Sequence, residues 1–222
     1  HFHTAADAVE PSGWAVLHEL RTSIENVYSG WFVPQLGAAW AKVVEGDQGL
    51  LQRWAIPDVT PQQAFYEREV QPLYSGGAKR VFVVISDALR YEVAQELVQF
   101  TNGKSRFKAS LGTMLGVLPS YTALGMAALL PHQTLAYKES ANLDVLADGH
   151  LVATLEQRNE HLKSVGGMAI KAEDLMALGK EKGRELVRER QLIYIYHDRI
   201  DMTGDKQASE SKTFEAAAQT VQ

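Results

Sequence analysis

The sequence has no cysteine among its 222 residues. Disulfide bonds and thiolate metal ligands are therefore excluded, and a metal ion would have to be held by carboxylate, imidazole or hydroxyl groups. The lack of cysteine also fits a cytoplasmic protein, because disulfides are rare in that compartment.

The sequence also lacks long apolar runs and one-sided charge. No run approaches the roughly 20 residues that a membrane-spanning helix needs, so no membrane segment is expected. The net charge is −5, with acidic and basic residues interspersed. Because there is no basic stripe, tight DNA binding by these residues is not expected, and any DNA contact would come from regions outside them.

The two ends of the chain look unusual. It begins at His1 rather than methionine and stops within a helical pattern at residues 216–222, where no capping residue is present. We therefore expect a fragment of a longer protein. The hydrophobic content of 45% is nevertheless ordinary for a chain that buries a core.

Two regions with different patterns follow one another. Residues 1–78 are predicted as an all-helical segment, because apolar residues recur there every three or four positions. Residues 79–222 are predicted as an α/β domain with a doubly wound, mostly parallel sheet covered on both faces. The predicted strands are 80–86, 106–111 and 192–197; the predicted helices are 90–100, 122–130, 151–161 and 173–190; residues 132–150 are predicted as loop.

The most informative residue is Asp87, which follows the apolar run Val81–Ile85. Such a run is typical of a buried parallel strand, and ligands of α/β proteins bind at the carboxyl ends of these strands. A carboxylate there suits a metal ion, although an aspartate after a strand can equally cap the next helix. A phosphoacceptor role is disfavoured, because no acidic pair leads this strand. A nucleotide-binding domain is disfavoured because no glycine-rich loop follows it.

A second candidate is the hydroxyl pair Ser120 and Thr122, at the start of a predicted helix of small and aliphatic residues. A hydroxyl beside a metal ion can ionise and attack phosphorus. The alternative is that one of the two side chains merely caps the helix.

The third candidate is the acidic segment that follows the last predicted strand. Asp201 and Asp205 lie four residues apart, so one helical turn or a compact loop would bring their carboxylates together. Two carboxylates at that distance repel each other unless a cation lies between them. The segment could also be a solvated turn, and His197 is expected to be a hydrogen-bonded structural residue.

Taken in order, the three segments resemble the alkaline phosphatase superfamily and, more narrowly, the PglZ domain, the phosphatase-like component of bacterial BREX phage-defence systems. The resemblance spans roughly residues 80–215. It rests on the sequences Val84–Glu92, Leu118–Pro131, Tyr196–Asp201 and Gly204–Asp205.

The resemblance implies an active site with two divalent metal ions, usually zinc. By motif match, Asp87 would be a metal ligand, Thr122 would be both ligand and nucleophile, and Asp201 would be a further ligand. Asp205 would be a less secure ligand, because the related enzymes carry histidine at its position. That replacement would favour magnesium or manganese over zinc.

One part of the implied site is missing. The superfamily takes further ligands from an Asp-His pair after a later strand and from a distant histidine, and this chain has no such pair. We therefore expect the fragment alone to be inactive, with incomplete metal sites, and the complete protein to be a metal-dependent phosphoester hydrolase.

The alternative is a non-catalytic scaffold. Other defence-system proteins would be its partners, and Trp14, Trp31, Trp40 and Trp54 could mark partner surfaces, although ordinary helix packing is the favoured explanation of these residues.

Overall fold

The computed structural model describes residues 2, 5, 15–46, 50–104, 106–139, 143–206 and 210–221. The chain divides into two compact units, one of His1–Pro57 with Thr203–Gln222 and one of Asp58–Met202. The sequence placed the boundary after residue 78. In the structure, residues 58–78 belong to the α/β unit, because Val70, Tyr66 and Tyr74 pack in its core. Trp14 lies outside the described residues.

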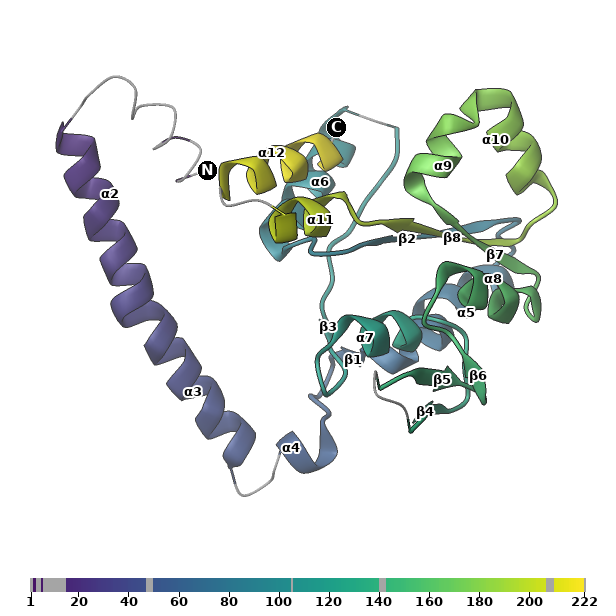
Figure 1. Ribbon diagram of the computed structural model, residues 1–222, viewed down its shortest axis with the longest axis horizontal. Coiled ribbons are helices and arrows are strands. Elements are labelled where there is room, and N and C mark those ends of the chain that lie inside the picture. Colours follow the sequence, from purple (N-terminus) through teal and green to yellow (C-terminus); the bar gives the residue numbers. More distant parts are fainter. Residues whose placement is uncertain are drawn as a thin grey trace. The chain divides into compact units, whose positions relative to one another are not determined.

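The described part of the first unit is helical. Figure 1 shows α2 (Ala15–Val27) continuing into α3 (Val33–Glu45) as one long rod, through a single π-helical turn, η2 (Tyr28–Phe32). Gly30 and Pro34 would ordinarily interrupt a helix, yet both lie within the rod, Gly30 in η2 and Pro34 just after it. The N–H that proline lacks falls next to the π-helical turn, where the regular α-helical hydrogen bonding is already interrupted. The remaining helices of this unit are α4 (Leu50–Arg53), the end of α11 (Arg199–Lys206) and α12 (Glu210–Val221).

The α/β unit is built on a parallel sheet with strand order β2-β8-β7. These strands are β2 (Val81–Ser86), β8 (Leu192–His197) and β7 (Gly167–Lys171). Strands β2 and β8 are paired so that Val81 lies opposite Leu192 and Ser86 lies opposite His197. The predicted strands 80–86 and 192–197 are confirmed, and they are parallel neighbours.

One face of this sheet carries the core. Val83, Leu192 and Tyr194 lie on it, and the strands of this face pack against α5 (Gln71–Ser75), α7 (Thr122–Ala128) and α8 (Leu155–Lys163), which lie below the sheet in Figure 1.

The other face is covered only in part. Helix α9 (Ala172–Ala177) lies against β7 and β8. On β2, however, Phe82 is 48% exposed and Val84 is 63% exposed. The expectation of burial on both faces is therefore wrong for this strand: among the described residues, the face of β2 opposite the core leaves these two side chains open to solvent.

The segment after the first crossover helix differs from the prediction. Residues 106–111 form no strand, and Phe107 is 67% exposed. The predicted loop 132–150 instead contains antiparallel strands that pair in the order β4-β5-β6. The strands of this small sheet are β4 (Leu135–Tyr137), β5 (Val145–Ala147) and β6 (His150–Leu151). A separate parallel pair is formed by β1 (Thr60–Pro61) and β3 (Met114–Leu115).

The connecting helices are close to the predicted positions, except that one predicted helix is two helices in the structure. Helix α6 (Tyr91–Lys104) follows β2, and the predicted helix 173–190 is split into α9 and α10 (Gly179–Arg188). The division falls at Gly179, whose φ of 70° is a left-handed conformation that favours glycine. Short turns precede α5: η3 (Gln62–Ala64) and η4 (Tyr66–Val70). No helix among the described residues is long and apolar enough to cross a bilayer.

Candidate active site

Asp87 lies at the carboxyl end of β2, where the ladder to β8 ends. Its backbone N–H donates to the carbonyl of His197 at 2.8 Å. Its carboxylate accepts the N–H of Ala88 at 3.0 Å. Helix α6 begins only at Tyr91, so Asp87 does not cap it. Among the described residues the carboxylate has no further partner in any recorded contact, which leaves one oxygen available to a ligand.

The backbone directly after Asp87 is strained. Ala88 has a φ of 59°, in the left-handed region that costs a residue with a Cβ atom about 1 kcal/mol. The turn is closed by a long hydrogen bond of 3.4 Å from the Leu89 N–H to the Ser86 carbonyl. Left-handed residues of this kind gather at functional sites, because the surrounding structure must hold them there.

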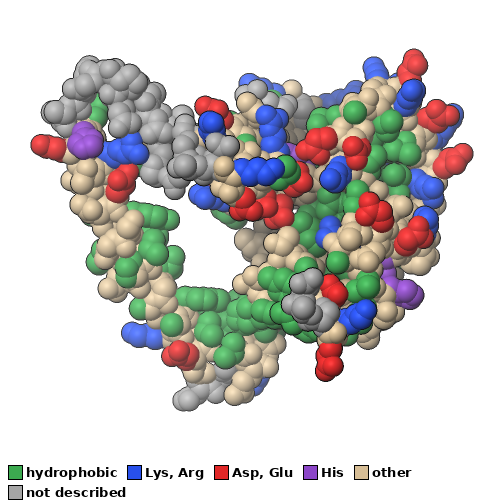
Figure 2. Space-filling view, in the orientation of Figure 1, with side chains coloured by type: hydrophobic (Ala, Val, Ile, Leu, Met, Phe, Trp, Pro, Cys, Tyr) green, Lys and Arg blue, Asp and Glu red, His purple; other side chains and the backbone are tan. Residues whose placement is uncertain are grey.

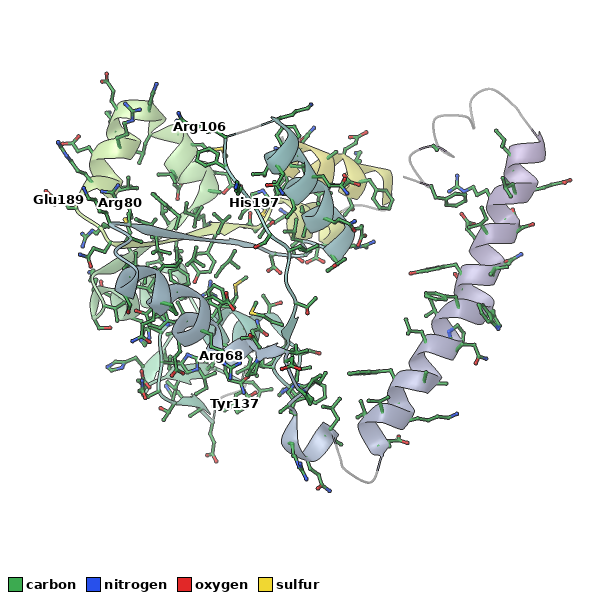
Figure 3. The ribbon with its side chains drawn as sticks, turned by 180° about the vertical axis from the view of Figure 1, so that it is seen from behind. Arg68, Arg80, Arg106, Tyr137, Glu189 and His197 are labelled. Atoms are coloured by element: carbon green, nitrogen blue, oxygen red, sulfur yellow. The ribbon has the colours of Figure 1, made fainter. Side chains whose placement is uncertain are left out.

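Side chains join the two strands at the same end. The hydroxyl of Ser86 and Nδ1 of His197 lie 2.9 Å apart, within hydrogen-bonding distance. Figure 3 shows His197 at the opposite end of the strand pair from Arg80. His197 is thus hydrogen-bonded, as expected. No local pattern indicates Ser86 as its partner, because that pairing depends on the register of strands far apart in the chain.

The two acidic candidates after β8 lie in one short helix. Asp201 is in the first turn of α11 and is half-buried, and Asp205 lies four residues later in the same helix. Of the two arrangements considered, a helical turn or a compact loop, the structure has the helical turn. Asp205 is exposed and belongs to the first compact unit, whereas Asp201 belongs to the α/β unit.

Thr122 begins helix α7 and its side chain is exposed. The N-cap residue is Tyr121, and no side-chain hydrogen bond caps the helix. Neither Ser120 nor Thr122 therefore plays the capping role that was the alternative interpretation. The core residues Leu124 and Ala127 anchor α7 in the same cluster as β2 and β8.

The segment around Thr122 is held by contacts that were not predicted. The side chain of Gln62 accepts the N–H of Val117 at 3.1 Å and donates to the carbonyl of Gly125 at 3.0 Å. The hydroxyl of Tyr121 donates to the carbonyl of Leu143 at 2.9 Å. These bonds join residues far apart in sequence, so no local pattern could have indicated them.

The candidate residues carry the kinds of donor atom that a divalent metal ion binds. Asp87 and Asp201 offer hard oxygen ligands, and Thr122 offers a hydroxyl, which suits zinc, manganese or magnesium. In the part of the chain that the structure describes, no three His, Asp or Glu side chains are gathered as a metal-binding group. The donor types of these three residues thus suit such an ion, while the described residues do not by themselves supply a gathered coordination shell.

Comparison with known proteins gives consistent similarities. Residues 65–222 match the family model described as the BREX system PglZ alkaline phosphatase-like domain. The alkaline phosphatase-like protein BrxZ of Escherichia coli O9:H4 (strain HS) is 45% identical over 221 residues, which cover 99% of this chain and 25% of that protein. The alkaline phosphatase-like protein PglZ of Bacillus cereus (strain H3081.97) is 36% identical over 224 residues, which again cover 99% of the chain and 25% of the protein. The chain therefore spans about a quarter of the length of these relatives.

Proposed function

Because the chain belongs to the PglZ family of alkaline phosphatase-like BREX proteins, we propose that it forms part of the active site of a metal-dependent phosphoester hydrolase. The observation that supports this most is the position of Asp87. It has a carboxylate oxygen available, it lies at the carboxyl end of a parallel strand directly before the strained residue Ala88, and the neighbouring strand leads to Asp201.

In this proposal Asp87, Thr122 and Asp201 are metal ligands, and Asp205 contributes more weakly. A bound divalent cation would favour the ionised hydroxyl and neutralise the phosphate oxygens. Zinc is the first choice by family resemblance, with manganese and magnesium as alternatives.

Thr122 would be the nucleophile. Its Oγ1 would give its proton to solvent water and form a bond to phosphorus, while the bond from phosphorus to the leaving oxygen breaks on the opposite side and that oxygen takes a proton from water. A second water molecule would then hydrolyse the phosphothreonine and restore the hydroxyl. An exposed hydroxyl that has no role in capping the helix is available for this step. The hydrogen bonds of Gln62 and Tyr121 would hold the segment that carries it, so that the oxygen keeps its orientation.

The test is metal reconstitution of the full-length protein. The protein is stripped with a chelator, reloaded separately with zinc, manganese and magnesium, and assayed with p-nitrophenyl phosphate and bis-p-nitrophenyl phosphate. We expect hydrolysis of at least one substrate that depends on the added metal. Loading of metal without turnover of either ester would favour a scaffold role in the defence complex.

The other components of the BREX system are the partners that we propose for the complete protein. A cytoplasmic location fits this proposal, because the DNA of an infecting phage and the other components would meet there.

A further inference from the structure

The helical rod of residues 15–45 exposes a long apolar stripe. Trp31 is 61% exposed and Leu36 is 58% exposed. Figure 2 shows hydrophobic side chains gathered along the rod, with charged ones near its two ends, and no charged residue occurs between Glu25 and Lys42. The exposed members of the stripe are Leu20, Ile24, Val27, Tyr28, Trp31, Phe32, Leu36, Trp40 and Val43. A helix with so little polar surface in its middle is typically covered.

The π-helical turn keeps this stripe on one side of the rod. Up to Trp31 the main apolar positions are spaced four, three and four residues apart, and from Leu36 onward four and three. The step between Trp31 and Leu36 is five residues. In a regular α-helix this step would place Leu36 about 140° around the helix axis from Trp31, so the apolar residues of the two halves would face different sides. The π turn, closed by the Val33 N–H on the Tyr28 carbonyl, takes up the additional residue and brings both halves back into line.

We propose that this stripe pairs with the same stripe of a second copy of the chain, antiparallel, about a two-fold axis near the Val33–Pro34 bond. In a two-fold interface the same patch is used by both copies, so each residue must suit the residue at the mirrored position. Six of the nine members of the stripe have another member at the mirrored position, whereas the mirrored positions of Leu20, Tyr28 and Phe32 are Asp47, Ala39 and Gln35.

Large apolar residues lie at equal distances on either side of the Val33–Pro34 bond. Two residues, six residues and nine residues out, both mirrored positions are apolar, and in an antiparallel pair they would form successive layers of contact. The mirrored pairs are Trp31 with Leu36, Val27 with Trp40, and Ile24 with Val43.

The flanks of the stripe are complementary as well. Beside the central layers, the side chains of one copy lie between two layers of the other. On one side of the stripe the nearest neighbour of Tyr28 would be Gly37 of the second copy, and on the other side Gly30 would face Ala39. A Cβ atom added at Gly37 meets nothing within 4 Å in the described chain. That open space is what a tyrosine ring from a second copy would occupy.

The size of the stripe is sufficient for a stable pair. Nine large side chains that are about half exposed can each lose on the order of 80–100 Å², or roughly 800 Å² per copy, which is the amount found in interfaces of standard size. Neither a metal ion nor the proposed hydrolase activity is needed for this association.

The first test measures the oligomeric state of the full-length protein by analytical ultracentrifugation. We expect a dimer at about 10 µM. Gly37→Leu should raise the dimer dissociation constant about tenfold or more, because the new side chain fills the space for Tyr28. The same variant should stabilise the helix itself, since leucine is a better helix former than glycine.

Asn26→Leu is the matched control. It introduces the same side chain on the opposite face of the rod and should leave the dissociation constant unchanged. A monomeric parent protein, or a dimer that is insensitive to Gly37→Leu, would overturn the proposal.

The second test uses the absence of cysteine from these 222 residues. Ile24→Cys and Val43→Cys are combined in one chain, which should form a disulfide-linked dimer under mild oxidation. Each single variant should remain uncrosslinked, because antiparallel pairing separates identical positions. The parent full-length protein controls for cysteines elsewhere. Crosslinking of the single variants, or none in the double variant, would show that the stripe is paired differently or covered by its own chain.

Discussion

The two ends of the β2–β8 strand pair are held together by different chemistry. At the amino end, the Arg80 guanidinium donates to the carbonyls of Arg188 and Arg190 at 2.9 and 3.1 Å. At the carboxyl end, the Ser86 hydroxyl and the His197 ring make the link. Figure 3 shows Arg80 at one end and His197 at the other.

From this difference we expect the polar groups at the amino end to be structural and those at the carboxyl end to be functional. At the amino end each donor meets a backbone acceptor, which completes the hydrogen bonding of the adjoining loop. At the carboxyl end Asp87 keeps an oxygen available beside a strained residue, Ala88. Substitutions at the amino end should therefore change stability, whereas substitutions at the carboxyl end should change activity.

The largest expected effect is that of Thr122→Ala. If Thr122 is the nucleophile, phosphoester hydrolysis by the metal-loaded full-length protein should fall on the order of 10⁴-fold. The melting temperature should stay the same, because the Thr122 side chain makes no capping bond. Ser120→Ala is the matched control and should remain active. An inactive Ser120→Ala together with an active Thr122→Ala would assign the nucleophile to Ser120.

The next effect is that of Asp87→Asn. The amide oxygen can still accept the Ala88 N–H, so the turn should persist, but the charge that holds a cation is lost. We expect metal affinity to fall more than about 100-fold, as measured by titration of the metal-stripped protein. Unchanged affinity would remove Asp87 from the ligand set. Asp201→Asn tests the acid that follows the neighbouring strand in the same way.

A smaller effect, on stability alone, is expected in the core. The fully buried hydroxyl of Tyr194 donates to the Leu129 carbonyl at 2.7 Å and thereby fastens the end of α7 to β8. Burial also raises the Tyr194 pKa, which keeps the hydroxyl protonated as a donor. Tyr194→Phe should lower the free energy of unfolding by about 1–3 kcal/mol in urea denaturation, because the carbonyl loses its partner. If turnover at saturating metal falls with it, Tyr194 does more than hold the core together.

The smallest effect is expected from Arg80→Ala. It removes two hydrogen bonds at an exposed position and should lower the unfolding free energy by only about 0.5–1 kcal/mol. Hydrolysis and metal affinity should not change. A loss of activity greater than a few-fold would break the proposed division between the two ends.

The strands that carry the site were predictable from the sequence, because the signal lies in the residues of each strand itself. Val81–Ile85 and Leu192–Tyr196 are runs of β-branched, aromatic and aliphatic residues that end in polar groups. Such runs form strands wherever the chain places them, so both strands and the position of Asp87 could be predicted. The start of α7 at Thr122 was predicted for the same reason, since Pro119 stops any helix that would extend upstream.

The missed elements depend on tertiary contacts. The strands β4 and β5 are three residues each, too short to give a periodic pattern, and β7 is rich in small residues. Residues 106–111 alternate like a strand, but no described strand pairs with them. The hydrogen bonds from the Gln62 side chain to Val117 and Gly125, and the pairing of Ser86 with His197, likewise depend on how distant segments of the chain come together.

The pairing of β2 with β8 also has a consequence for how the chain is made. Ser86 and His197 are separated by 111 residues. At about 5–20 residues per second, a ribosome needs roughly 6–20 s to synthesise the intervening chain. During that interval β2 has emerged without the neighbour that satisfies its backbone, and contacts between such distant segments form slowly. The pair can therefore form only after β8 has been synthesised, and a pause in translation between the two strands would lengthen the time in which the unpaired backbone of β2 is open to capture by a chaperone or by another nascent chain.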